Sequence, residues 1–229
     1  MKSKQALGIA DLMSGLMMVF LLIAIAFMLD VEAQKNAIQR QKDAMTEIVA
    51  VAEESRIKLH NELVQEFGRN LKQWDMEILI DNTVRFKAPH VLFRRGKSVL
   101  TQKFKRILSD FFPRYLAILQ AYSAELEAIR IEGHTSSDWK NGASYLGNVE
   151  LSQRRALSTL KYCYSLQKVK NKRQWLQQVL KANGLSFAKR IFNKDGTENF
   201  EKSRRVEFKV ITKAEEKLYQ ILERSRQEN

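Results

Sequence analysis

The chain has 229 residues, 45% of them hydrophobic, which is enough for one ordinary domain with accessory segments. Its formal net charge of +13 suits polyanionic partners such as nucleic acids, cell-wall polymers or membrane headgroups. The single cysteine, Cys163, excludes an intrachain disulfide, and its place in the apolar pattern LSTLKYCYSL predicts a buried thiol.

Residues 6–29 form an apolar block that predicts a transmembrane helix. At about 1.5 Å per residue this helix is about 36 Å long, enough to cross a hydrocarbon layer of about 30 Å. A cleaved signal peptide is the alternative, but its apolar core would be shorter and would end at a small-x-small site. Here the apolar run continues directly into Asp30 and Glu32, so we expect an uncleaved anchor.

The charges that flank this anchor predict its topology. Lys2 and Lys4 precede it and acidic residues follow, so the positive-inside rule places residues 1–5 in the cytoplasm. The domain after Leu29 is then periplasmic, on a single-pass protein of the bacterial inner membrane. Without the anchor, 37 basic and 25 acidic residues remain, a net charge of +12. Cell-wall polymers and headgroups are the polyanions within its reach, and we expect no direct nucleic-acid binding.

Residues 30–68 predict a helical stalk, because they contain no proline and no glycine before Gly68. Apolar residues recur every seven positions, as in a weak dimeric coiled coil: Ile38, Met45, Ala52 and Leu59. A solvated amphipathic helix that folds onto the following domain remains the alternative.

Residues 69–212 predict an α+β sandwich domain, in which strands alternate with helices after an opening hairpin. Asp81 and Asn82 form the predicted hairpin turn. We expect strands at 76–88 (the hairpin), 128–134 and 204–211, helices at 96–119, 148–167 and 172–184, and a polar loop at 193–203. The first helix offers a core face of Val99, Phe104, Ile107, Leu108, Phe111 and Phe112. Residues 213–229 predict a polar helical tail.

Asp11 is the one charged residue within the apolar block. A charged Asp at the bilayer centre costs about 2.5 to 3.5 kcal/mol, and less near an interface. Gly8, Ser14 and Gly15 share its helix face and would let another helix approach closely. A carboxylate that alternates between a low-dielectric site and water can carry H⁺ or Na⁺. An interfacial or purely structural Asp is the alternative.

The segment ADLMSGLMMVFLLIAIAF resembles the anchors of the stator family that includes MotB, ExbD and TolR. The resemblance implies that Asp11 is ion-translocating and that the anchors form a homodimer inside a pentamer of a multi-span partner. Ion flow would then drive relative rotation.

A second segment, IRIEGHTSSDWKNGASYLGNVELSQRRALSTL, resembles the signature of OmpA-like peptidoglycan-binding domains. SRRVEF resembles the closing strand of the same domain, with Ser203 in place of Asn, and the resemblance covers roughly residues 75–211. The matching signature residues are Gly133, His134, Thr135, Asn148, Leu151, Ser152, Arg155 and Ala156.

The OmpA-like resemblance implies which residues bind peptidoglycan. In that family an Asp after Gly-His-Thr and the Arg of Leu-Ser-x-x-Arg bind the ammonium and the carboxylate of diaminopimelate, and a planar guanidinium suits a carboxylate. The Arg corresponds to Arg155, whose alternative is an ordinary exposed helix cation. Ser136 occupies the acid position, and Asp138 is the candidate substitute. The implied peptidoglycan-binding residues are Thr135, Asp138, Asn148, Leu151 and Arg155. His134 is expected to be a structural turn residue, and Trp139 either covers the ligand or anchors its loop.

The combination of anchor, stalk and OmpA-like domain resembles flagellar MotB and, more closely, the ZorB proteins of the Zorya anti-phage defence system. The early anchor, the segment GHTSSDW and the long insertion before SRRVEF favour the latter. This resemblance implies a pentameric, multi-span ZorA-like partner. A flagellar stator or a static membrane-to-wall tether is the alternative. No nucleophile-base pair, phosphate loop or metal-ligand spacing points to an enzyme or a cofactor.

Overall fold

The structure is a computed structural model that describes residues 2–87, 89–94, 96–138 and 145–214, with side chains from Leu12 onward. The chain divides into two compact units. One contains the N-terminal residues through Ala50, and the other extends from Val51 to Glu216.

Helix α1, Lys2–Phe67, is continuous through the predicted anchor and the predicted stalk, which confirms that both are helical. Among the described residues it is the one helix that is long and apolar enough to cross a membrane. Its apolar side chains between Leu12 and Leu29 are exposed in the single chain, as those of a lipid-facing helix would be.

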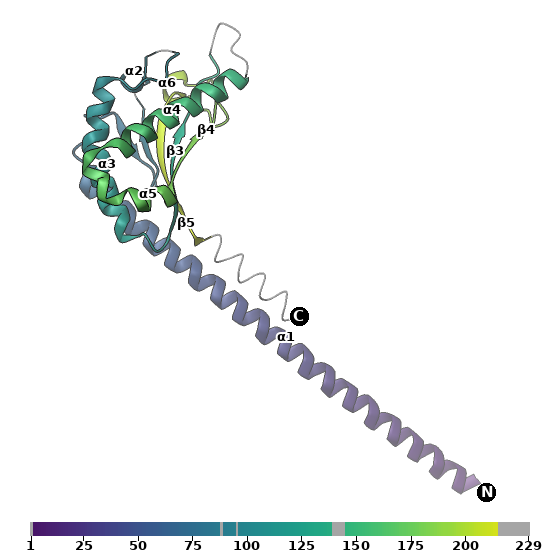
Figure 1. Cartoon of the computed structure of the whole chain (residues 1–229). Coiled ribbons are helices and arrows are strands. Elements are labelled where there is room, and N and C mark those ends of the chain that lie inside the picture. The colour runs from purple at the N-terminus through teal and green to yellow at the C-terminus, as the bar shows by residue number, and fades with distance from the viewer. Residues whose placement is uncertain (1, 88, 95, 139–144, 215–229) are drawn as a thin grey trace. The chain divides into compact units, whose positions relative to one another are not determined.

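The second unit is built on a five-stranded mixed sheet with the order β1-β2-β5-β3-β4. Strands β3 and β4 pair in parallel, and the other neighbours are antiparallel. Helix α4 passes across β3 and β4 on the core face of the sheet (Figure 1). The elements are β1 Met76–Ile78, β2 Val84–Phe86, α2 Pro89–Leu92, α3 Gln102–Ala121, β3 Leu126–Gly133, α4 Tyr145–Ser165, the 3-10 helix Gln167–Lys172, α5 Arg173–Val179, β4 Leu180–Gly184, α6 Phe200–Ser203 and β5 Val206–Thr212.

The opening hairpin is confirmed. Met76 pairs with Phe86 across β1 and β2, and Asn82 in the turn has a φ of 63°, a left-handed conformation that Asn tolerates better than most residues.

Three expectations are corrected. The helix predicted at 172–184 ends at Val179, because residues 180–184 extend and pair with β3. The predicted loop at 193–203 ends in the short helix α6, capped by Asn199. Val99 is 71% exposed rather than in the core, because α3 begins only after the N-cap Thr101. The predicted tail beyond residue 214 lies outside the described residues.

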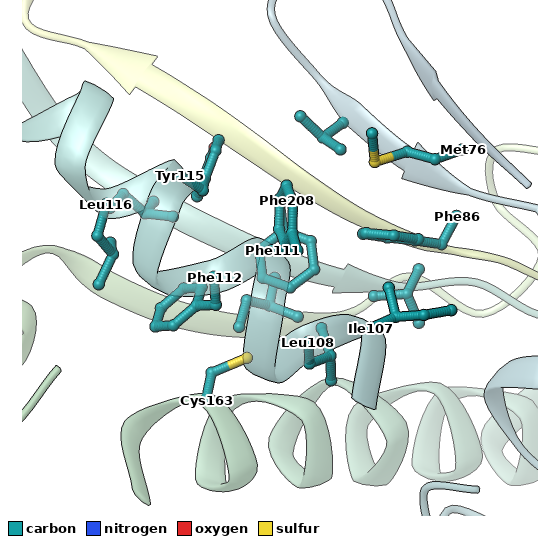
Figure 2. Packing of buried hydrophobic residues seen from close by; sticks show 14 of the residues in the cluster. Met76, Phe86, Ile107, Leu108, Phe111, Phe112, Tyr115, Leu116, Cys163 and Phe208 are labelled. Atoms are coloured by element: carbon teal, nitrogen blue, oxygen red, sulfur yellow. The ribbon is translucent and has the colours of Figure 1, made fainter. Parts of the chain in front are cut away.

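Aromatic rings from α3 and the sheet form the centre of the core (Figure 2). The Phe111 ring lies 5.1 Å from the Phe208 ring of β5 and 5.2 Å from the Phe86 ring of β2. Burial of each such side chain contributes about 1.5 to 3 kcal/mol. Cys163 is buried, as predicted, and its sulfur points toward α3 in Figure 2.

The last turns of α1 belong to this core. Leu59, Leu63 and Phe67 are buried, and the Phe67 ring lies 5.1 Å from that of Phe111. The Arg114 guanidinium lies over the Phe67 ring and pairs with the Glu66 carboxylate at 2.6 Å. Residues 51–67, assigned to the stalk from sequence, thus pack as part of the folded domain.

Candidate functional site

The candidate site lies where helix α4 crosses the ends of β3 and β4. Gly133 and Gly184, the last residues of these strands, touch the α4 backbone. A Cβ atom at Gly133 would lie 2.3 Å from the Ser152 carbonyl oxygen, and one at Gly184 would lie 2.3 Å from the Gln153 nitrogen. Only glycine permits this approach, which brings the Arg155 turn of α4 against the loop that follows β3.

That loop, residues 134–138, is held by hydrogen bonds to neighbouring segments. The His134 amide donates to the Arg205 carbonyl at 3.0 Å, and the Thr135 amide donates to the Ser186 carbonyl at 2.8 Å. The Ser186 amide in turn donates to the Ser152 hydroxyl on α4 at 2.9 Å. The loop position is therefore set by three separate parts of the chain.

Arg155 is only 8% exposed, which rules out the alternative of an ordinary exposed helix cation. Its Nε donates to the Lys97 carbonyl at 3.0 Å, and its guanidinium carbon lies 5.1 Å from the centre of the Phe93 ring. Its Nη1 and Nη2 atoms have no acceptor among the described residues. Burial, with a smaller effect from Arg204, lowers the pKa of Arg155 to about 10, so the side chain is still charged at neutral pH.

Asp138 is paired with Arg204, a residue that the sequence analysis did not select. Arg204 Nη1 lies 3.0 and 3.2 Å from the two Asp138 carboxylate oxygens and 3.1 Å from the Ser136 hydroxyl. The Ser136 hydroxyl also donates to Asp138. Burial opposes ionisation of Asp138, but Ser136 and Arg204 outweigh it and lower the pKa of this carboxyl.

Several buried polar atoms of the site have no hydrogen-bond partner among the described residues: Thr135 Oγ1, Asn148 Oδ1 and Ser186 Oγ. Asn148, Leu151 and Arg155 share one face of α4, as their spacing predicts. Buried polar groups are rarely left unpaired in folded proteins, but these atoms are themselves shielded from solvent, so they mark the site without offering a direct contact to a ligand.

The sequence signal for Arg204 was present in the SRRVEF motif, which marked the strand but not the contact of its first arginine with Asp138. A second missed residue is Glu198, whose carboxylate accepts hydrogen bonds from the Ser137 amide and hydroxyl. It connects the insertion before β5 to the loop that carries Asp138. Trp139 lies outside the described residues.

A separate buried cluster contains His134, Glu132 and Glu207, with one ligand atom of each residue within 4.8 Å of the others. Three ligands of one cation could have this spacing. However, Arg85 and Arg205 each donate to Glu207 at 2.6 Å, and Lys189 lies 3.9 Å from Glu132.

Cationic side chains therefore already balance both carboxylates of this cluster. Burial lowers the pKa of His134 and would raise that of Glu207, but His134 and Arg205 hold the pKa of Glu207 well below its usual range. We interpret the cluster as a charge network that holds β3 and β5 together, consistent with a structural His134.

The predicted ion-path residues all lie in α1. The side chains of Gly8 and Asp11 are outside the described part of the structure. Ser14 is exposed, and a Cβ atom at Gly15 would meet nothing within 4 Å. This part of the helix surface is free in the single chain, and the role of Asp11 stays a prediction.

Comparison with known proteins places these features in a family. The OmpA family matches residues 92–204, a range that contains Asp138, Arg155 and Arg204. Zorya protein ZorB of Escherichia coli (strain Crooks) is 40% identical over 221 residues, which cover 94% of this chain and 91% of that protein. The chain belongs to the ZorB family.

The fold of this ZorB-family chain also has a counterpart among solved structures. A MotB-like protein from Desulfovibrio vulgaris is 24% identical, with a TM-score of 0.52 over 70% of this chain and 96% of that one. This match shows a shared fold and confirms the predicted α+β, OmpA-like class.

Proposed function

We propose that this protein is the peptidoglycan-anchored, stator-type subunit of an ion-driven inner-membrane motor in anti-phage defence. The observation that carries the proposal is the 40% identity to Zorya protein ZorB along 94% of the chain, which includes both the apolar helix and the OmpA-family domain. Neither part alone would distinguish a motor subunit from other wall-binding proteins.

In this function the domain holds the cell wall through the site at the ends of β3 and β4. The buried Arg155 presents two nitrogens without acceptors in the described structure, while Asn148 lies on the same helix and Thr135 on the adjoining loop. A stem-peptide carboxylate would satisfy the guanidinium. Asp138 and Leu151 complete the proposed wall-binding set.

Asp11 carries the ion, H⁺ or Na⁺, in the proposed mechanism. It is the only charged residue between Lys4 and Asp30. A carboxyl group within an apolar helix favours its neutral form and regains its charge where water or a partner hydroxyl reaches it. Gly8, Ser14 and Gly15 on the same helix face would let a second helix pack closely enough to shape that path.

The proposed assembly is a homodimer of this chain with its anchors inside a pentamer of a multi-span, ZorA-like partner. Residues 1–5 lie in the cytoplasm and the domain lies in the periplasm. Two observations are consistent with this arrangement. The apolar α1 side chains are exposed, as those of a helix in lipid would be, and the chain beyond the anchor has a net charge of +12.

The deciding experiment is phage protection by the complete neighbouring operon with Asp11→Asn. We expect loss of protection at unchanged membrane level and assembly, because Asn cannot exchange a proton or balance a cation. Asp30→Asn is the matched control, since it removes a carboxylate just beyond the apolar block, and it should keep protection.

Full protection by Asp11→Asn would contradict the motor and favour a static membrane-to-wall tether. If even the unchanged operon gave no protection, the defence assignment would fail and a flagellar-type stator would become the better alternative.

A further inference from the structure

The candidate site contains more positive than negative charge. Within the described structure, Arg155 and Arg204 each bring a guanidinium, and Asp138 is the carboxylate that pairs with one of them. The Arg155 turn of α4 lies against the end of β3, since a Cβ atom at Gly133 would lie 3.4 Å from the Ala156 nitrogen, and the loop that follows β3 carries Asp138 with its partner Arg204. The three residues together carry a formal charge of +1, and the Glu198 carboxylate beside the same loop is balanced by Arg190.

The Arg155 guanidinium is oriented before any ligand arrives. Its Nε is fixed by the Lys97 carbonyl, and its central carbon lies over the Phe93 ring. The edge formed by Nη1 and Nη2 is the part without an acceptor among the residues described. Two parallel N–H groups in this geometry match the two oxygens of a carboxylate, and prior orientation lowers the entropy cost of binding.

Asp138, in contrast, is not available as an unpaired acid. Both of its oxygens lie within 3.2 Å of Arg204 Nη1, and the Ser136 hydroxyl donates to it as well. An ammonium group placed against Asp138 would also lie beside Arg204 and be repelled by it. Ser136, at the position where OmpA-like domains have their acid, is uncharged.

We infer that the site recognises a carboxylate without an adjacent ammonium group, held by Arg155 and by Nε and Nη2 of Arg204, which have no acceptor among the residues that the structure describes. This inference rests on the proposed wall-binding function and specifies its ligand class. The free carboxylate end of a stem peptide fits this chemistry, whereas the zwitterionic end of diaminopimelate gains nothing from its ammonium group. Arg204 is then a specificity-determining residue.

Competition for purified sacculi tests the inference with the full chain in detergent. The two competitors are meso-diaminopimelate and pimelate, the same dicarboxylate without the amino groups. We expect pimelate to release the protein at a concentration equal to or below that of meso-diaminopimelate. Arg155→Ala should abolish specific competition by both, and Arg154→Ala, which changes an exposed cation on the same helix, should leave it unchanged.

Two variants should each shift the preference away from pimelate, by different routes. Arg204→Gln should weaken pimelate about tenfold, the effect of losing one charge-assisted contact. Ser136→Asp restores an acid at the family position and should improve meso-diaminopimelate relative to pimelate, again by about tenfold. The unfolding midpoint of each variant shows whether it is still folded, and either variant alone can report the change in preference.

A wild-type preference for meso-diaminopimelate of about tenfold or more would overturn the inference while leaving wall binding intact. Competition by neither compound, with sacculus binding still dependent on Arg155, would also overturn it. If the unchanged protein does not bind sacculi, the proposed anchoring function itself fails, and the inference fails with it.

Discussion

Arg155 is a buried cation without a counter-charge among the described residues. Its burial and the nearby Arg204 lower its pKa, which means that the folded protein stabilises the charged guanidinium less well than water does. In the protein without ligand, the buried charge raises the free energy of the folded state. Binding of an anionic ligand would remove this cost. The same residue can therefore be a cost to folding and the main contributor to binding.

This balance predicts that Arg155→Ala has a large effect on binding and a small effect on stability. Sacculus binding should fall at least about tenfold, because a charge-assisted pair is lost. The free energy of unfolding should change by less than about 1 kcal/mol, because removal of an unpaired buried charge offsets the lost packing on Phe93. Co-sedimentation and urea unfolding measure the two quantities. Equal losses of stability and binding would instead indicate a structural role.

Glu207 shows the opposite case, a buried acid with close cationic partners. Its folded-state pKa is lowered, so its stabilising contribution is complete above the unfolded-state value of about 4.3 and is lost as the pH falls below it. Glu207→Gln leaves Arg85 and Arg205 without their shared partner, which should cost about 3 to 5 kcal/mol at neutral pH.

Urea unfolding of the fragment 51–216 between pH 7 and pH 3 checks this prediction. The acid-induced loss of stability should be smaller in Glu207→Gln than in the unchanged fragment. Glu150→Gln, at an exposed ion pair on α4, is the control and should leave both the stability and its pH dependence unchanged. An equal pH dependence in all three proteins would show that Glu207 does not titrate as described.

The sequence was informative about single residues where a motif fixes both residue type and spacing. Arg155, Asn148 and Thr135 were predicted in this way, and the structure puts them on α4 and on the adjoining loop. Arg204 was missed because its contact with Asp138 joins residues 66 positions apart. Such a contact depends on how the insertion before β5 folds, which no local pattern encodes.

Among the elements, the last turns of α1 contribute directly to the core. Leu63 is fully buried while its neighbour Val64 is 40% exposed, so only one face of this segment enters the core. Leu63→Ala should therefore reduce the free energy of unfolding by about 2 to 5 kcal/mol. Val64→Ala, as the matched control, should cost far less.

The same packing predicts that the domain boundary chosen from sequence is too late. A fragment that begins at residue 69 lacks Leu59, Leu63 and Phe67 and should unfold at a lower urea concentration than one that begins at Val51. Equal urea midpoints of the two fragments would show that the last turns of α1 do not stabilise the domain.

Periodicity predicted most helices and strands, but it could not distinguish the end of α5 from β4. The segment 172–184 has mostly good helix formers before Asn183, yet Leu180 begins a strand because β3 offers a parallel edge. The choice depends on tertiary contacts, such as the close approach of Gly184 to the α4 backbone. The prediction for Val99 was wrong for a local reason, because the cap at Thr101 makes the helix begin at Gln102, after Val99.

For the whole molecule, charge and site should contribute separately to attachment. The net charge of +12 beyond the anchor gives a general attraction to anionic wall polymers. Raising the salt concentration from about 0.1 M to about 1 M shortens the Debye length from about 10 Å to about 3 Å. This change should remove the general electrostatic attraction. Binding that remains at high salt should require Arg155. If high salt abolished all binding to sacculi, general charge rather than the site would dominate.

The overall organisation was predictable because each of its parts has a strong local signature. An apolar block, an uninterrupted helical segment and two spaced motifs identified the anchor, the helix and the domain class. The two-unit division at residue 50 was not predictable, because it depends on which turns of a uniform helix find a hydrophobic partner.

The embedding of α1 in the core also determines how the domain would respond to mechanical force. A pull on the chain from the N-terminal side of Val51 first reaches Arg56, whose carbonyl accepts a hydrogen bond from the Asn82 side chain in the β1–β2 turn, and then Phe67 and the Glu66–Arg114 pair. These contacts would resist the force, while the Arg155 site on α4 lies further along the chain. In the proposed motor, such a subunit would transmit torque without distorting its wall-binding site.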